Sequence, residues 1–142
     1  MSIDIPDSHL DLLTQPLHIP LTTLMPDGTP QMSIVWRLWE KPHILISSPK
    51  GSQKTRNVKR DPRVTMLLVD PDNSYRYLEI RGIVQRVEGD SDCAFLERIT
   101  QFYLNKPYYG GAAPIENKGK EVHVIFEIAL QKVNVIDYPQ LI

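Results

Sequence analysis

Ser47-Ser48-Pro49-Lys50-Gly51-Ser52-Gln53-Lys54-Thr55-Arg56-Asn57 begins where the apolar run 43–46 stops, and the chain can be interpreted outward from it. The stretch passes through a Pro and a Gly and then has the pattern of a helix start, with Ser52 as the N-cap. The first turn of a helix has unpaired backbone N–H groups and the positive end of the helix dipole. The stretch therefore predicts a strand that leads into a helix N-terminus able to bind a phosphate group.

Basic and hydroxyl side chains surround this predicted helix start. The ones that suit a phosphate site are Lys50, Lys54 and Arg56, with the hydroxyls of Ser47, Ser48, Ser52 and Thr55. A Lys/Arg run on a surface helix is also typical of a solvated face, and the charge pattern alone does not separate the two interpretations. We assign Lys59 and Arg60 to a solvated face.

Composition and charge restrict the classes of protein. With 142 residues, 42% of them hydrophobic and 23% charged, the chain fits a single globular domain over residues 1–142. The formal net charge of −1 argues against a general nucleic-acid binder, so the basic cluster suits a small anion better than a polyanion. The sole cysteine, Cys93, excludes an internal disulfide framework and fits the cytoplasm, where we expect this protein.

Membrane and metal sites are not expected. The N-terminal segment is acidic and lacks a long apolar run, so we predict neither a signal peptide nor a membrane span. Cys93 falls inside a predicted helix without a neighbouring base and is not expected to be a nucleophile. The histidines have no ligand spacing, and each is predicted to be structural or exposed rather than metal-bound: His9, His18, His43 and His123.

Hydrophobic periodicity and turn signals predict a mainly β fold with a few helices. A short N-terminal helix, capped by Asp7 or Ser8, is expected to end at Pro16 and to form a small plug. Gly82, inside a long strand, predicts a bulge or bend. The candidate segments are 18–25, 31–39, 43–48, 63–69, 75–87, 121–130 and a last run 132–138, and about six strands, joined mostly by hairpins, are expected among them.

Two later segments complete this prediction. Ser91 is the expected cap of a helix in which Phe95, Ile99 and Phe102 share a face and pack on the sheet. Residues 105–120 have no clear period and predict a long loop. Its tyrosines, Tyr108 and Tyr109, form either a lid over a ring or an ordinary packed surface loop.

The segment 31–39 has large apolar residues on both of its faces. Met32, Ile34 and Trp36 alternate with Ser33, Val35 and Arg37, and Trp39 follows on the second face. A strand with one solvated face has a plainly polar outer side, so this pattern indicates a second burial surface, either a subunit interface or a flat ligand. The alternative is a strand partly covered by the N-terminal helix.

The order of these parts resembles a known family. A hairpin through 26–30, the strand 31–37, the triplet 46–48, the helix start 51–54, Asp61-Pro62-Arg63-Val64 and Gly82 are similar to the flavin-binding split barrel of the pyridoxamine-phosphate-oxidase-like superfamily. Lys54-Thr55-Arg56-Asn57 followed by Arg60-Asp61-Pro62-Arg63 most resembles the small members that use the deazaflavin coenzyme F420. The resemblance implies a six-stranded antiparallel split β-barrel that binds F420 or FMN.

The resemblance also implies positions for the cofactor. The strand that faces the isoalloxazine corresponds to Met32, Ser33, Ile34, Val35, Trp36 and Arg37, the next contacting pair to Ser47 and Ser48, and the phosphate-binding lysine to Lys54 with Gln53 beside it. Asn57 belongs to the part most similar to the deazaflavin-dependent members. Tyr77 stands where the oxidase has a glutamine that contacts the ring, and Met32 or Ser33 stands where it has an arginine. We therefore do not expect pyridoxamine phosphate as the substrate.

Three functions follow from these observations. The first is an oxidoreductase in which a bound F420 or FMN carries out hydride transfer with a small organic substrate, so that no side-chain triad is needed and the catalytic residues stay unassigned. The second is a non-catalytic module of the same fold that binds a flavin, haem or phosphorylated vitamin. The third, least favoured, is a nucleic-acid-binding barrel with stacking tryptophans. We also expect a homodimer with the cofactor in the interface, as in the family.

Overall fold

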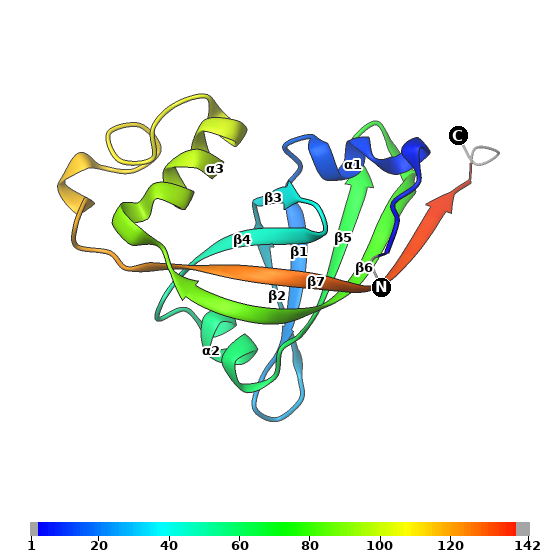
Figure 1. Cartoon of the computed structure of the whole chain (residues 1–142), viewed down its shortest axis with the longest axis horizontal. Coiled ribbons are helices and arrows are strands. Elements are labelled where there is room, and N and C mark those ends of the chain that lie inside the picture. Colours follow the sequence, from blue (N-terminus) through cyan, green and yellow to red (C-terminus); the bar gives the residue numbers. More distant parts are fainter. Residues whose placement is uncertain (1–2, 139–142) are drawn as a thin grey trace.

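The computed structural model describes residues 3–138, and their seven strands form one antiparallel sheet in the order β2-β1-β5-β6-β7-β4-β3. The elements in chain order are η1 (Asp7–His9), α1 (Asp11–Thr14), β1 (Ile19–Leu24), β2 (Pro30–Val35), β3 (Arg37–Glu40), β4 (His43–Pro49), α2 (Gln53–Arg60), β5 (Arg63–Asp70), β6 (Asn73–Gly89), η2 (Ser91–Cys93), α3 (Ala94–Leu104), η3 (Ile115–Asn117) and β7 (His123–Asp137). The sheet curls into a half-barrel, with α3 to one side of it (Figure 1). The predicted split barrel is confirmed, with one strand more than expected.

Apolar residues that alternate along the strands fill the interior of the barrel. Ile44, Leu78 and Phe126, from β4, β6 and β7, are each 0% exposed. The short helix α1 contributes Leu12 and Leu13 to the same core, so it acts as the predicted plug. Within residues 3–138, none of the helices is both long enough and apolar enough to cross a membrane.

Two long strands join the halves of the sheet. β6 and β7 pair along most of their length and run across the sheet in Figure 1. Their register shifts between Arg81 and Gly82, which confirms the predicted irregularity. A Cβ on Gly82 would lie 2.6 Å from Ile128 Cγ2 and 2.9 Å from the Ala129 carbonyl oxygen. Only a residue without a side chain therefore fits this close approach of the two strands.

The prediction of a single strand over 31–39 is wrong. β2 pairs with β1 at one edge of the sheet, and β3 pairs with β4 at the other edge. The ladder breaks at Trp36, where the chain passes from one edge of the sheet to the other. The alternation of side chains continues through the break because the backbone stays extended. Periodicity shows that a segment is extended but not which strand it pairs with, so no sign of the break appears in the sequence.

The opposite error occurs at the C-terminal end. The segments predicted as two strands, 121–130 and 132–138, are one strand, β7. Its pairing with β6 skips Gln131, because Gly82 faces Leu130 while Arg81 faces Lys132. One unpaired residue of this kind is a β-bulge, which interrupts the alternation of the sequence without ending the strand.

The predicted caps of the first and third helical segments are also wrong. η1 and α1 begin without a side-chain hydrogen bond at their N-caps, so neither Asp7 nor Ser8 is a cap. At α3 the capping group is Asp90 rather than Ser91. Its two carboxylate oxygens accept the N–H groups of Phe95 and Leu96, each at 2.9 Å. The carboxylate therefore satisfies two donors of the first turn of α3.

Candidate functional site

The junction between β4 and α2 forms as the sequence predicts. Ser52 is the N-cap of α2, and its Oγ accepts the N–H of Thr55 at 3.2 Å. The hydroxyls of Ser48, Ser52 and Thr55 lie 2.8 to 2.9 Å from one another, and Thr55 also donates to the Pro49 carbonyl at 2.8 Å. These three hydroxyls therefore fix the loop and are already bonded within the protein.

The side chains of Ser47 and Lys54, in contrast, have no hydrogen-bond or ion-pair partner among residues 3–138. Ser47 follows Ile46 on β4 and points to the face opposite Ser48; its Oγ is buried and unbonded. The half-buried Lys54 ammonium makes no ion pair or hydrogen bond with a described residue, and burial lowers its pKa. A cation taken partly out of water without a counter-ion is unfavourable, so this position suits a bound anion.

The first turn of α2 adds backbone donors to the same place. The N–H groups of Gln53 and Lys54 are among the donors that a helix cannot satisfy internally, and no acceptor for them lies in the described part of the chain. Together with the Lys54 ammonium and the positive end of the helix dipole, they form the chemical environment of a phosphate site.

These groups border a cleft of about 210 Å³ between the sheet and α3, which we call the candidate cleft. Five residues from the sequence prediction line it: Ile34, Val35, Trp36, Ser47 and Lys54. The end of β2, the strand β4 and the start of α2 thus bring an apolar wall and a cationic end together. A planar ring with an attached phosphate matches this arrangement of surfaces.

Five lining residues were not predicted as site residues: Pro49, Leu96, Ile99, Tyr108 and His123. The sequence predicts only that the apolar face of α3 packs on the sheet. Tyr108 belongs to the loop for which a lid was one of two interpretations, and burial raises the pKa of its hydroxyl. No signal in the sequence connected His123, at the start of β7, with Lys54.

Trp36 has a fixed orientation at the wall of the cleft. Its ring stacks on Tyr103 of α3, with centroids 4.7 Å apart and planes inclined by 11°. The Tyr103 hydroxyl donates to the Leu17 carbonyl at 2.6 Å and accepts the backbone N–H of Arg37 at 3.1 Å. The break between β2 and β3 is therefore held against α3 by both stacking and hydrogen bonds.

Besides Ser48, two predicted site residues have their side chains buried inside the protein rather than in the cleft. Arg37 is 0% exposed; it donates to the carbonyls of Leu12 and Gln15, and burial lowers its pKa. Asn57 is also 0% exposed and donates to Thr23 Oγ1 at 2.9 Å. Arg37 thus ties α1 to the sheet, and Asn57 ties α2 to β1.

The other predicted residues surround the cleft or lie apart from it. Gln53 and Arg56 are bonded to each other at 2.6 Å on the exposed side of α2. Met32, Ser33 and Lys50 lie on β2 and in the loop before α2, next to lining residues. Tyr77, on β6, lines a separate depression with Leu67, Val69 and Ile136.

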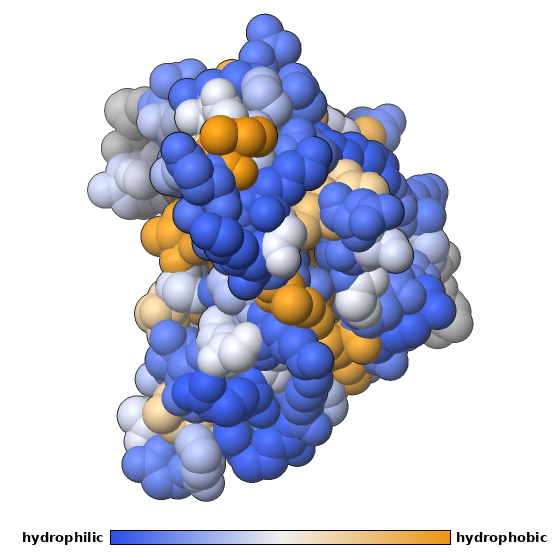
Figure 2. Space-filling view, turned by 90° about the vertical axis from the view of Figure 1, so that its left-hand side faces the viewer, coloured by the Kyte–Doolittle hydropathy of each residue, from blue (hydrophilic) through white to orange (hydrophobic). Residues whose placement is uncertain are grey.

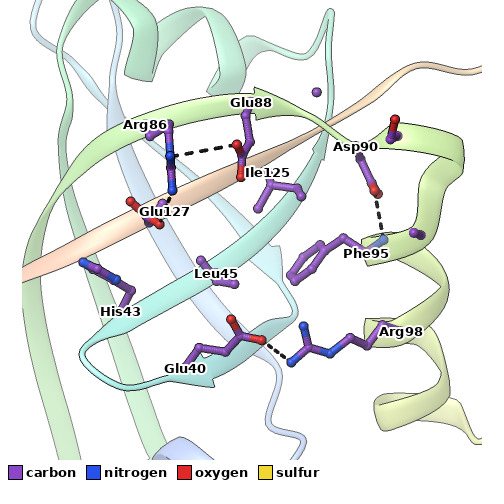
Figure 3. Close-up of a pocket in the computed structure, with 13 residues that line it drawn as sticks. Glu40, His43, Leu45, Arg86, Glu88, Asp90, Phe95, Arg98, Ile125 and Glu127 are labelled. Atoms are coloured by element: carbon purple, nitrogen blue, oxygen red, sulfur yellow. Dashed lines mark hydrogen bonds and ion pairs between the residues drawn. The ribbon is translucent and has the colours of Figure 1, made fainter.

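A larger groove, of about 590 Å³, lies between the sheet and the start of α3 (Figure 3). Its charged side chains compensate one another: Arg98 pairs with Glu40, and Arg86 pairs with Glu127 at 2.8 Å and with Glu88 at 3.9 Å. We place the candidate site at the smaller cleft because a cation without a counter-ion lies there.

Comparisons with known proteins agree with this fold. Over residues 5–137 the chain matches the family model described as pyridoxamine 5'-phosphate oxidase. A solved F420 reductase is 34% identical, with 92% of this chain and 98% of that chain covered and a TM-score of 0.80.

Two more distant solved structures share the fold alone. General Stress Protein 26 from Bacillus anthracis is 19% identical, with 91% of this chain and 95% of that chain covered and a TM-score of 0.63. The haem storage protein HutZ from Vibrio cholerae is 10% identical, with 96% and 97% covered and a TM-score of 0.65. The match of the family model over nearly the whole chain decides the family: the chain belongs to the pyridoxamine 5'-phosphate oxidase family.

Proposed function

We propose that this protein is an oxidoreductase that binds coenzyme F420 or FMN in the candidate cleft and acts on a small organic substrate. The observation that carries the proposal is Lys54, a half-buried ammonium without a counter-ion among residues 3–138, beside unpaired N–H groups at the start of α2. The 34% identity with an F420 reductase over most of both chains supports the deazaflavin as the first candidate.

The residues of the cleft would bind and orient the cofactor. Lys54 and the first turn of α2 would hold the phosphate. The Ser47 hydroxyl, buried and unbonded, would donate to or accept from a polar atom at the edge of the ring. Trp36, fixed by its stacking on Tyr103, would limit how the ring can turn and exclude water. The cofactor, when bound, supplies hydride-transfer chemistry that amino-acid side chains lack.

We further propose that the protein is a homodimer with the cofactor at the interface. A cleft of about 210 Å³ lies below the roughly 300–1,000 Å³ typical of small-molecule sites, so one chain supplies only part of the walls. Met32 and Ile34, on the edge strand β2, are 62% and 60% exposed, and a second copy would cover them. Tyr77 lines another depression within one chain, so its predicted contact with the ring requires the second copy.

The surface leaves room for such an interface. Figure 2 shows the face on which α3 and the loop 105–120 lie, with patches of hydrophobic residues between hydrophilic areas. The exposed large hydrophobic residues include Phe102, Leu104, Ile115 and Val122. Two-fold association is the commonest way for soluble proteins to cover such residues.

Binding and turnover of the cofactor test the proposal. The purified protein would be titrated with F420 and separately with FMN by fluorescence, and its mass in solution would be measured with and without the bound cofactor. We expect saturable binding of the cofactor by a dimer. We also expect that the reduced cofactor is reoxidised while a candidate acceptor is consumed.

Other outcomes distinguish the alternatives. Binding without turnover for any acceptor would favour the non-catalytic module, and a haem absorption band in the purified protein would favour a haem carrier. A monomer that binds the cofactor at micromolar concentration would refute the dimer. Lack of binding by both F420 and FMN would overturn the proposed function.

A further inference from the structure

A carboxylate on α3 fastens the loop that follows this helix. Oε1 of Glu97 accepts the backbone N–H of Tyr108 at 3.2 Å and that of Tyr109 at 3.3 Å. Oε2 of the same carboxylate lies 3.3 Å from the Tyr108 nitrogen, so two oxygens share this donor. Hydrogen bonds to a charged acceptor are about twice as strong as those between neutral groups. Glu97 therefore ties the loop 105–120 to α3.

The loop is compact beside this anchor. The carbonyl oxygen of Tyr108 accepts the N–H groups of Gly111 at 3.3 Å and of Ala113 at 2.7 Å. A Cβ on Gly111 would lie 2.2 Å from the Pro107 carbonyl oxygen, so the chain closes on itself tightly at this point. The backbone of Tyr108 thus donates to α3 and accepts from its own loop. The segment 107–113 is therefore a closed turn held on the helix, not an open strap.

The side chain of Tyr108 lies among the residues that line the candidate cleft. It packs against the buried cluster that includes Leu96 and Ile99 of α3. Its ring also lies at a centroid distance of 6.0 Å from the ring of His123, with planes inclined by 73°. Leu96, Ile99 and His123 all line the cleft, and Tyr108 lines it with them. A ligand in the cleft therefore meets Tyr108 as part of the wall.

We propose that Glu97 is a positioning residue, which holds Tyr108 on α3 so that the tyrosine ring is a fixed wall of the candidate cleft and contacts the planar ligand bound there. The inference rests on the proposed function and deepens it, because it assigns a ring contact from the loop 105–120 and the residue that maintains this contact. The loop then acts as a built wall rather than as a lid that opens. Contacts between aromatic rings depend on their relative orientation, so a displaced wall loses them.

A double-mutant cycle on cofactor affinity tests this inference. Coenzyme F420, or FMN if that alone binds, would be titrated by fluorescence into the wild type, Tyr108→Ala, Glu97→Ala and the double variant. Loss of the ring is expected to raise Kd by about two-fold to ten-fold, the range for one aromatic contact. Glu97→Ala is expected to raise Kd by up to the same factor in the wild type. It should have no further effect once Tyr108 is alanine, because Glu97 acts through that ring.

Two more variants serve as controls. Tyr108→Phe keeps the aromatic ring and is expected to bind as the wild type does. Glu116→Ala removes the same charge from an exposed position in the same loop, and it is expected to leave Kd unchanged. An equal effect of Glu97→Ala and Glu116→Ala would reflect net charge alone and would contradict the positioning role.

Amide hydrogen exchange without cofactor covers the case in which Glu97→Ala does not fold. In the unaltered protein the amides of Tyr108 and Tyr109 are expected to be protected. In the milder variant Glu97→Gln, which has lost the charge and one acceptor oxygen, their protection is expected to fall while that of the barrel strands persists. Exchange of both amides in the wild type at the rate of an unfolded chain would overturn the inference.

The affinity measurements separate this inference from the proposed function. Wild-type affinity in Tyr108→Ala would show that the ring does not contact the ligand. An equal loss on Glu97→Ala with and without the tyrosine ring would show a structural role only. Either result would overturn the inference and leave the proposed function standing, whereas absence of binding by both cofactors would overturn the two together.

Discussion

Removal of the Lys54 ammonium is the sharpest test of the candidate cleft. If Lys54 meets the cofactor phosphate, Lys54→Ala removes one charge-assisted hydrogen bond, which contributes about 1.5–3 kcal/mol. This corresponds to a rise in Kd of about ten-fold to a hundred-fold at 25 °C. The lower end of this range applies if water still reaches the ion pair, because Lys54 is half-buried rather than sealed.

The same substitution should leave the fold without cofactor intact. Burial lowers the pKa of Lys54, so the folded chain disfavours the charged form relative to the unfolded chain. The ammonium therefore destabilises the empty fold fully at pH values below that lowered pKa, and this effect declines above it and is gone once the pH passes the ordinary value of 10.5. We expect the free energy of unfolding of Lys54→Ala to be unchanged to within about 0.5 kcal/mol or slightly higher.

Lys59→Ala is the matched control for this experiment. Lys59 lies in the last turn of the same helix, α2, and is exposed. Its removal changes the net charge by the same amount but is expected to affect Kd far less, because exposed charges at a distance are screened by salt.

The assay is a fluorescence titration of the wild type and both variants with F420 and with FMN, together with thermal melts of the cofactor-free proteins. Equal losses of affinity in Lys54→Ala and Lys59→Ala would mean a diffuse positive field rather than a phosphate site. Unchanged affinity in both would mean that the phosphate binds elsewhere, and the assignment of the cleft would then be refuted.

Three further predictions concern the fold. Gly82→Ala should destabilise the protein by about 1–3 kcal/mol, because the new Cβ would lie 2.6 Å from a side-chain carbon of β7. Gly89→Ala is the control, because its Cβ would have no heavy atom within 4 Å and the free energy of unfolding should change little. Urea denaturation compares the two variants, and equal effects would contradict the packing argument. Asp90→Ala should cost about 0.5–2 kcal/mol through loss of the α3 cap, measured in the same way, and an unchanged midpoint would exclude the capping role. The Arg63 guanidinium lowers the pKa of Asp61 to about 2. The ion pair therefore stabilises the fold fully above the ordinary carboxyl pKa of 3.8, and this stabilisation is lost as the pH falls toward 2. NMR titration of the Asp61 carboxyl carbon should give a midpoint of about 2, and a midpoint near 3.8 would show that the pair does not form in solution.

Much of the site could be predicted because its signals are local. The Pro and Gly after β4, the N-cap at Ser52 and the position of Lys54 in the first turn follow from residues adjacent in the chain, and short-range hydrogen bonds determine helix starts. Gly82 was recognisable as an irregularity because glycine inside a strand interrupts an otherwise regular pattern. The resemblance to a known family added Ile34, Val35 and Trp36, which line the cleft.

The tertiary structure decided what depends on partners distant in sequence. The alternation over 31–39 fixes an extended backbone, but pairing of β2 with β1 and of β3 with β4 depends on strands elsewhere in the chain, so the break at Trp36 had no local signal. The burial of Arg37 also depends on a distant segment. An arginine is expected to be exposed, but here α1 covers it and accepts its hydrogen bond.

Sequence by itself therefore determined most of the helices and strands, the irregularity at Gly82 and the basic helix start that borders the cleft. Only the folded chain brought α3 and the start of β7 against β4, and so added Tyr108 and His123 to the walls. The reason is physical: a hydrogen bond between neighbours in sequence is fixed by residue type and spacing, whereas a contact such as that of His123 with Cys93, thirty residues apart, exists only after the sheet has curled and α3 has packed beside it.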